Sequence, residues 1–237
     1  MKATLHKAET RGHANHGWLN SYHSFSFANY YDPERENFGV LRVLNDDEVS
    51  AGMGFGMHGH SNMEIISIPL EGDLAHQDSM GNKAVIKSGD IQVMSAGTGV
   101  QHSEKNKNAD SKVKFLQIWV IPNKVNVEPR YDQITLKAAD MHNRFHQILS
   151  PNADDAGVWI HQNAWFHLGD FDTDRALTHR LKDMSNGLYV FVLEGKCTIG
   201  DITLGRRDGL GIEHTENVDF EIQPQTRLLL MEVPMSN

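Results

Sequence analysis

Two pairs of metal-ligand side chains are the chemically informative feature of this 237-residue sequence. His58 and His60 form the first pair, and His102 and Glu104 form the second. Residues two apart in a β-strand point to the same face, so two neighbouring strands carrying these pairs would direct all four side chains at one point. Three imidazoles and one carboxylate suit a divalent transition metal, iron, manganese, nickel, copper, cobalt or zinc among them, whereas magnesium or calcium would need more carboxylates. The sequence therefore predicts a metal centre, and the positions left open on an octahedral ion indicate a reactive site.

The segments between the two pairs are expected to form short strands and tight turns. Residues 65–70 are rich in β-branched side chains, and turn-forming residues follow at 71–73, 78–82 and 88–90. A single histidine is usually a surface or core residue, but two spaced pairs that flank such a segment favour a small antiparallel barrel with a metal at its mouth.

The carboxylate ligand is ambiguous from spacing alone. Glu64 lies four residues after His60, which would place both on one strand face, and Glu104 lies two residues after His102. The two carboxylates have equal geometric claims to the site.

The residues around both pairs resemble cupin motifs and, more specifically, the pirin family. The sequence Gly52-x5-His58-x-His60-x3-Glu64 is similar to the first cupin motif, and Gly99-x2-His102-x3-Asn106 is similar to the end of the second. The resemblance to pirins is highly specific over residues 54–67, 76–82 and 94–104, and it extends from about residue 11 to the C-terminus. Gly59 departs from the family, which usually has proline there; glycine should loosen the strand between the two ligands without removing either.

The resemblance implies a set of ligands and an activity. It implies that His58, His60, His102 and Glu104 hold the metal, with Fe(II) as the first expectation, and that Glu64 does not coordinate it. Bacterial members of the family include quercetin 2,3-dioxygenase-like proteins, so the expected reaction opens the ring of a flavonol such as quercetin with O2 and releases carbon monoxide. Glu104 would also be the catalytic base that accepts the proton of the flavonol hydroxyl.

Two further interpretations of the same resemblance stay open. Some pirin relatives resemble iron-binding redox sensors that act as transcription or metabolic co-regulators through a protein partner. The third interpretation is a bicupin scaffold with vestigial activity. Oxygen uptake and carbon monoxide release with quercetin would distinguish an enzyme from both.

The second half of the sequence repeats the first in outline, and together with the resemblance this implies an all-β fold of two tandem cupin barrels of the jelly-roll, double-stranded β-helix type, a bicupin. Residues 189–195 mirror 65–72, and 207–212 resemble 88–93. Aligning the two Glu-Gly turns places Leu181 and Asp183 where His58 and His60 stand, so the second copy has lost its metal pair. We expect an N-terminal barrel with the metal site at 1–125 and a degenerate C-terminal barrel at 126–237.

Composition and charge narrow the remaining function classes. The net charge of -9 argues against direct binding of nucleic acid, and no stretch approaches the length of a membrane span, so a cytoplasmic protein is expected. The single cysteine, Cys197, cannot form an internal disulfide and is expected to be a buried, inert thiol. Residues 11–32 are crowded with aromatic and histidine side chains; a strand that seals a barrel edge is favoured there over a flap that lines a pocket.

Overall fold

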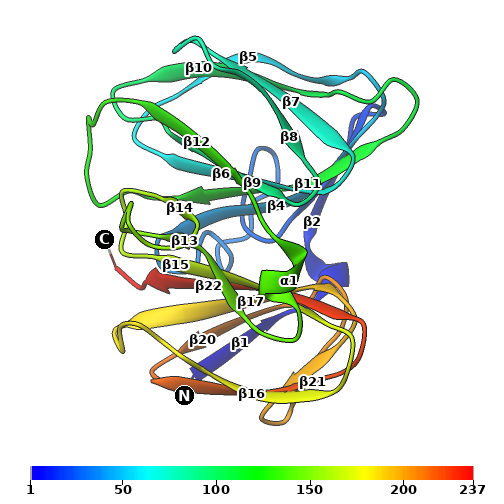
Figure 1. The fold of residues 1–237 in the computed structure, drawn as a ribbon, viewed down its shortest axis with the longest axis vertical. Helices are drawn as coiled ribbons and strands as arrows, with labels where there is room; N and C mark the ends of the chain where they lie inside the picture. Colours follow the sequence, from blue (N-terminus) through cyan, green and yellow to red (C-terminus); the bar gives the residue numbers. More distant parts are fainter. Residues whose placement is uncertain (1, 237) are drawn as a thin grey trace.

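The structure, a computed structural model, describes residues 2–236 and consists almost entirely of β-strands. Two barrels are stacked along the long axis of the molecule, each built from a seven-stranded and a four-stranded sheet (Figure 1). The two seven-stranded sheets face each other in the middle, and the four-stranded sheets cover the two ends. The predicted all-β class with two tandem barrels is confirmed.

The first barrel carries the predicted metal ligands. Its large sheet has the order β12-β9-β6-β11-β4-β3-β2, and its small sheet has the order β5-β10-β7-β8. The strands of the large sheet are β2 (Gly12–Asn15), β3 (Leu19–His23), β4 (Leu41–Val49), β6 (Glu64–Glu71), β9 (Asp90–Ser95), β11 (Val113–Val120) and β12 (Arg130–Thr135). Those of the small sheet are β5 (Gly54–His60), β7 (Asp73–Asp78), β8 (Lys83–Lys87) and β10 (Val100–Asn106).

The second barrel repeats this plan with the orders β1-β20-β17-β22-β15-β13-β14 and β16-β21-β18-β19. Its large sheet contains β1 (Lys2–His6), β13 (His146–Ser150), β14 (Val158–Trp159), β15 (Trp165–Phe171), β17 (Asn186–Glu194), β20 (Gly209–Glu213) and β22 (Thr226–Pro234). Its small sheet contains β16 (Arg175–Arg180), β18 (Cys197–Ile199), β19 (Ile202–Leu204) and β21 (Asn217–Ile222). Two short helical turns, η1 (Ala8–Thr10) and α1 (Ala138–Met141), join the strands.

Two strands belong to a different barrel from the one expected from a division between residues 125 and 126. Strand β1, at the N-terminus, pairs with β20 in the second barrel, and β12, after the division, pairs with β9 in the first. The two barrels are therefore linked by exchanged edge strands, and the division into 1–125 and 126–237 stays a prediction about domain units.

The large sheet of the first barrel is buried on both faces, and β11 shows how its sequence achieves this. Side chains alternate along a strand, so Leu116 and Ile118 join the core between the barrels, while Phe115 packs inside the first barrel. A strand covered on both sides needs apolar residues on both, which explains why the run from Val113 to Val120 is nearly continuously hydrophobic.

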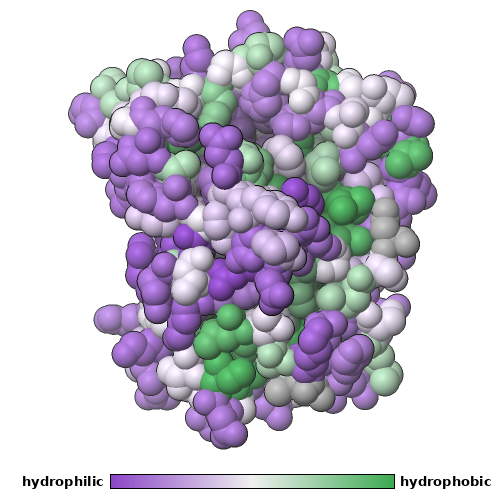
Figure 2. Space-filling model, turned by 180° about the vertical axis from the view of Figure 1, so that it is seen from behind, coloured by the Kyte–Doolittle hydropathy of each residue, from purple (hydrophilic) through white to green (hydrophobic). Residues whose placement is uncertain are grey.

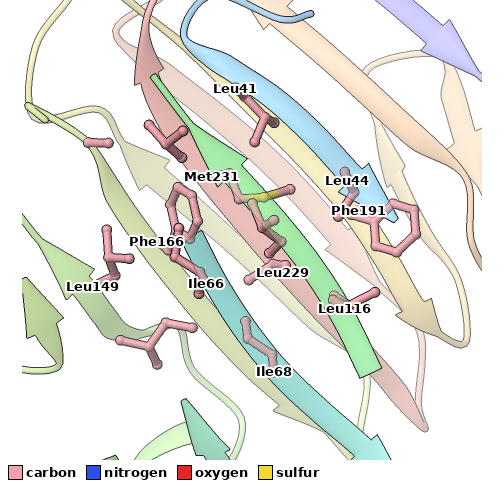
Figure 3. Close-up of a cluster of buried hydrophobic side chains, with 14 of the residues drawn as sticks. Leu41, Leu44, Ile66, Ile68, Leu116, Leu149, Phe166, Phe191, Leu229 and Met231 are labelled. Carbon is pink, nitrogen blue, oxygen red and sulfur yellow. The ribbon is translucent and has the colours of Figure 1, made fainter. Parts of the chain in front are cut away.

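The core between the barrels is the contact of the two large sheets, and Figure 3 shows their apolar side chains facing each other. Leu44, Ile66 and Leu116 come from the first barrel, and Phe166 and Leu229 come from the second. Because most large apolar side chains are buried in the cores, the face shown in Figure 2 is largely hydrophilic and has only small apolar patches. Among residues 2–236, no helix is long and apolar enough to cross a membrane.

Truncation of a side chain in this shared core should destabilise the whole protein. Leu229 is 0% exposed, so Leu229→Ala should lower the free energy of unfolding by about 2–5 kcal/mol, because it removes buried methyl groups and leaves a cavity. Met184 is 68% exposed, so Met184→Ala should change it by less than about 0.5 kcal/mol. Urea denaturation of both variants measures this, and equal destabilisation would contradict the assignment of the shared core.

Cys197 is fully buried, and burial raises the pKa of its thiol to about 12. A raised pKa keeps the thiol protonated, so almost no nucleophilic thiolate is present at pH 8. We expect no reaction of the native protein with a disulfide reagent such as DTNB at pH 8, and one thiol per chain to react after unfolding in guanidinium chloride. Rapid reaction of the native protein would show that the thiol is accessible.

Candidate metal centre

The three predicted histidine ligands are brought together by the pairing of β5 with β10. The two strands are antiparallel, and His102 lies directly opposite His58, with Val100 opposite His60. The three rings face one another with centroid distances of 4.4, 4.9 and 4.9 Å, and one ligand atom from each lies within 4.8 Å of the other two. This spacing is compatible with three nitrogen donors on one ion.

Gly54 sets this register at the start of β5. A Cβ atom there would collide with the backbone oxygen of Glu104 and the Cα of Lys105, so the two strands approach closely at this point. The register of the ladder shifts between His102 and Glu104, which is the mark of a β-bulge. Gly59 meets no such contact, because the nearest atoms to a Cβ there would lie at 3.8 and 3.9 Å.

The chemistry of the imidazoles fits a transition metal. Both ring nitrogens of His102 are buried and have no hydrogen-bond partner within the protein, and a bound ion would satisfy the unprotonated one of the two. His58 donates from Nδ1 to the backbone oxygen of Gly56 at 2.8 Å, which orients the ring and leaves Nε2 as the ligand atom. Burial lowers the pKa of His60 to about 4, and burial with the neighbouring imidazoles lowers that of His102 to about 3. Both rings are therefore neutral near pH 7, which is the metal-binding form.

Glu104 lies beside the three histidines but belongs to an overlapping group. Its carboxylate accepts hydrogen bonds from Ser67 Oγ at 3.0 Å and from Gln117 Nε2 at 2.7 Å. One carboxylate oxygen of Glu104 lies within 4.8 Å of ligand atoms of His76 and His102. The ligand atoms of His58, His60, His102 and Glu104, however, do not all lie within 4.8 Å of one another. Complete burial raises the pKa of Glu104 to about 7. Its coordination of the metal stays a prediction.

His76 is a site residue that the sequence did not reveal. It is buried on β7, directly opposite Glu104 on β10, and its ring centroid lies 5.4 Å from that of His102. Its Nε2 lies 3.2 Å from the carboxylate of Asp78, and its Nδ1 is buried without a partner. His76 and Asp78 lie two residues apart on one strand, which is the spacing of the pairs His58/His60 and His102/Glu104. This spacing could have indicated His76 as a site residue.

Glu64, the other carboxylate candidate, is outside both groups of potential ligands. The expectation that it shares a strand face with His60 was wrong, because β5 ends at His60 and Glu64 begins β6 after a turn in which Asn62 has φ 49°. Its carboxylate accepts a hydrogen bond from Ser95 Oγ at 2.7 Å, and burial raises its pKa to about 7.

A cavity of about 120 Å³ opens beside the histidines, bounded by His58 and Glu104 on one side. Residues 11–32, which are rich in aromatic and histidine side chains, form β2 and β3 at the edge of the large sheet, as expected. Residues of both strands also line the cavity, which is what the alternative interpretation of a pocket-lining flap predicted. Phe55 and Trp119 supply apolar walls, and Trp119 makes an edge contact with His60 at 5.0 Å.

The corresponding strands of the second barrel do not bring three histidines together. Strand β16 pairs with β21 as β5 pairs with β10, and the facing residues are His179 opposite Val218 and Leu177 opposite Phe220. Both groups of potential metal ligands found within residues 2–236 lie in the first barrel.

Two stacked cupin barrels with a three-histidine site in the first define a bicupin with one candidate metal centre. Residues 4–120 match the family model described as Pirin, and residues 147–233 match the model described as Quercetinase C-terminal cupin domain. The chain belongs to the pirin family.

Individual relatives cover nearly the whole chain. A protein of Escherichia coli (strain K12) named Quercetin 2,3-dioxygenase is 40% identical over 230 residues, which are 97% of this chain and 98% of that one. The crystal structure of YhhW from Escherichia coli superimposes with a TM-score of 0.94 at 39% identity and covers 98% of both chains. A structure of the bacterial pirin YhhW in complex with nickel(II) gives a TM-score of 0.93 at 39% identity, with 98% of this chain and 99% of that one covered.

Loss of the central histidine should abolish metal binding. His102→Ala removes the imidazole shared by both groups of ligand atoms, so its affinity for Ni²⁺ should fall by more than about 100-fold. His142→Ala is the control, because that side chain is 59% exposed and lies outside both groups. Isothermal titration of the metal-free proteins with Ni²⁺ measures the difference. Unchanged affinity in His102→Ala would exclude the site.

Proposed function

We propose that this protein is a metal-dependent dioxygenase that opens the ring of a flavonol such as quercetin with O2. The observation that carries the proposal is a largely apolar cavity that is lined by His58, one of the three clustered histidines, and by the buried carboxylate of Glu104. The name of the Escherichia coli relative supports the same reaction.

The metal is proposed to be held by His58, His60 and His102, with Glu104 as a fourth, loosely bound ligand. Fe(II) is the first candidate, and Mn, Ni, Cu, Co and Zn are the alternatives; the nickel complex of YhhW supports a site that accepts divalent transition metals. When bound, such a metal supplies a positive charge that lowers the pKa of a coordinated hydroxyl group.

Glu104 is proposed to accept the proton of the flavonol hydroxyl. A pKa of about 7 suits a general base that works near neutral pH, because the group is partly ionised and still basic. The hydrogen bonds from Ser67 and Gln117 fix the carboxylate's orientation, and Gln117 Nε2 stabilises the charge of its ionised form.

The apolar walls of the cavity are proposed to bind the flat rings of the substrate. Leu19, Phe27, Phe55 and Trp119 line it, and they can cover an aromatic ligand while excluding water. Met53, one residue before β5, is 45% exposed and does not line the cavity.

The test is aerobic turnover of quercetin by the metal-loaded protein. Each flavonol consumed should take up one O2 and release one carbon monoxide, with the remaining atoms in the ring-opened ester. Glu104→Gln keeps the size of the side chain but cannot accept the proton, so the turnover rate should fall by about 100-fold or more.

Glu64→Gln is the matched control, because Glu64 is also a buried carboxyl with a pKa raised to about 7 but is outside the ligand groups. It should retain the wild-type rate. Consumption of quercetin without carbon monoxide, or equal rates for the two variants, would count against the proposal.

A further inference from the structure

A polar hollow of about 430 Å³ lies where the two barrels meet. The first barrel contributes β4 and β11 to its lining, with Asp46 and Lys114, and the second contributes the turn between β19 and β20, with Arg206 and Arg207. The segment between η1 and β2 adds Arg11. Its volume lies within the range of about 300–1,000 Å³ that is typical of small-molecule sites.

Two buried guanidinium groups share one carboxylate in this hollow. The side chains of Arg11 and Arg207 are 7% and 6% exposed. Arg11 Nη1 and Arg207 Nε donate to the same oxygen, Asp46 Oδ2, at 3.2 and 2.8 Å. The Arg11 guanidinium also lies 4.8 Å from the centroid of the Tyr22 ring, and Arg207 has φ 67°, a strained backbone conformation of the kind that is often found at functional sites.

Each guanidinium keeps one amino group for a ligand. Arg11 Nε donates to the backbone oxygen of Ala8 at 3.2 Å, and Arg207 Nη1 donates to the backbone oxygen of Leu193. The Nη2 group of each arginine has no hydrogen-bond partner in the protein, and neither Nη2 atom is sealed from solvent. Both therefore open into the hollow that their side chains line. Because both guanidiniums bind the same carboxylate oxygen, the two Nη2 groups lie close together.

The other carboxylates around the hollow do not neutralise the second guanidinium. Asp47 turns its carboxylate into the first barrel, where it accepts a hydrogen bond from Ser21. Glu48 accepts a hydrogen bond from Lys112, and Glu9 is exposed. Two buried cations thus face one buried carboxylate, and an uncompensated buried charge costs free energy.

The remaining charges near the two arginines lie toward solvent. Lys114 is paired with Glu71 at 2.6 Å, and Arg206 is paired with Glu194 at 2.8 Å. Glu194 also lies 3.8 Å from Arg207 Nη1, but it is 54% exposed, so solvent screens this contact. Burial lowers the pKa of Arg11, and the charge of Arg207 adds to this effect while Asp46 opposes it, as expected where negative charge is in deficit.

We propose that Arg11 and Arg207 form a binding site for a phosphate group in the hollow between the barrels. Guanidinium groups bind the oxygens of carboxylates and phosphates through paired N–H groups. A planar carboxylate would satisfy one of the two arginines, whereas the tetrahedral oxygens of a phosphate can accept from both Nη2 groups. Strand β4 separates this site from the cavity beside the metal centre, because Asp46 faces the hollow and Asp47 faces into the first barrel.

The test is isothermal titration of the nickel-loaded protein at pH 8 with inorganic phosphate and with phenyl phosphate, both of which are dianions at this pH. Wild type should bind one phosphate per chain with a Kd on the order of 1 mM or lower, because two charge-assisted hydrogen bonds form. Tighter binding of phenyl phosphate would identify an organic phosphate as the ligand, and equal binding would identify free phosphate. His102→Ala, designed to lose the nickel, should bind both with the wild-type Kd.

Arg11→Lys keeps the positive charge but removes the second amino group, so the Kd for phosphate should rise at least about tenfold. Arg206→Gln does not depend on refolding of a buried contact, since the side chain is 57% exposed at the hollow, and should raise the Kd about threefold. Lys112→Gln is the matched control, because that side chain is 58% exposed and does not line the hollow, and its Kd should stay within about twofold.

The outcomes decide the proposal. Absence of saturable phosphate binding by wild type, or one Kd shared by wild type, Arg11→Lys and Arg206→Gln, would overturn the site. Loss of phosphate binding in His102→Ala would place the anion at the metal centre and would overturn the site as well.

Discussion

The register of β5 against β10 is the constraint on which the candidate centre depends. Side chains alternate along a strand, so a slip of one residue would turn His58 and His60 away from His102. The close approach of backbone at Gly54 and the bulge between His102 and Glu104 oppose such a slip. The geometry of three side chains is thus determined by backbone contacts that involve none of their ring atoms.

The two faces of the large sheet of the first barrel have different roles: one packs against the second barrel, and the other borders the candidate metal centre. The face toward the second barrel carries the apolar core and packs against Phe166 and Leu229. The opposite face carries a row of directly opposed polar residues from His23 on β3 to Ser67 on β6, and this row borders the cavity. Burial of Ser67 and Gln117 on this face is tolerated because both are hydrogen-bonded to Glu104.

The local sequence pattern was sufficient for the strands, the all-β class and the two pairs of ligand-type residues, since alternation and turn residues act over short ranges. It was insufficient wherever the outcome depended on pairing between distant segments. Glu64 could be placed correctly only if the turn at Asn62 ended β5, and His76 gained its neighbours only when β7 paired with β10. The exchange of β1 and β12 between barrels is equally non-local. The chemistry of the cavity wall depended on which side chains face each other across β3, β4 and β11, which no single stretch encodes.

The exchanged edge strands bear on how the two halves can evolve. A gene split at the linker would leave each half without an edge strand and with an unpaired sheet border, a surface that invites aggregation. Duplicated barrels that have become interlocked in this way are inherited together. The second copy can then lose its ligands without being discarded, because its sheet still completes the fold of the copy that retained them.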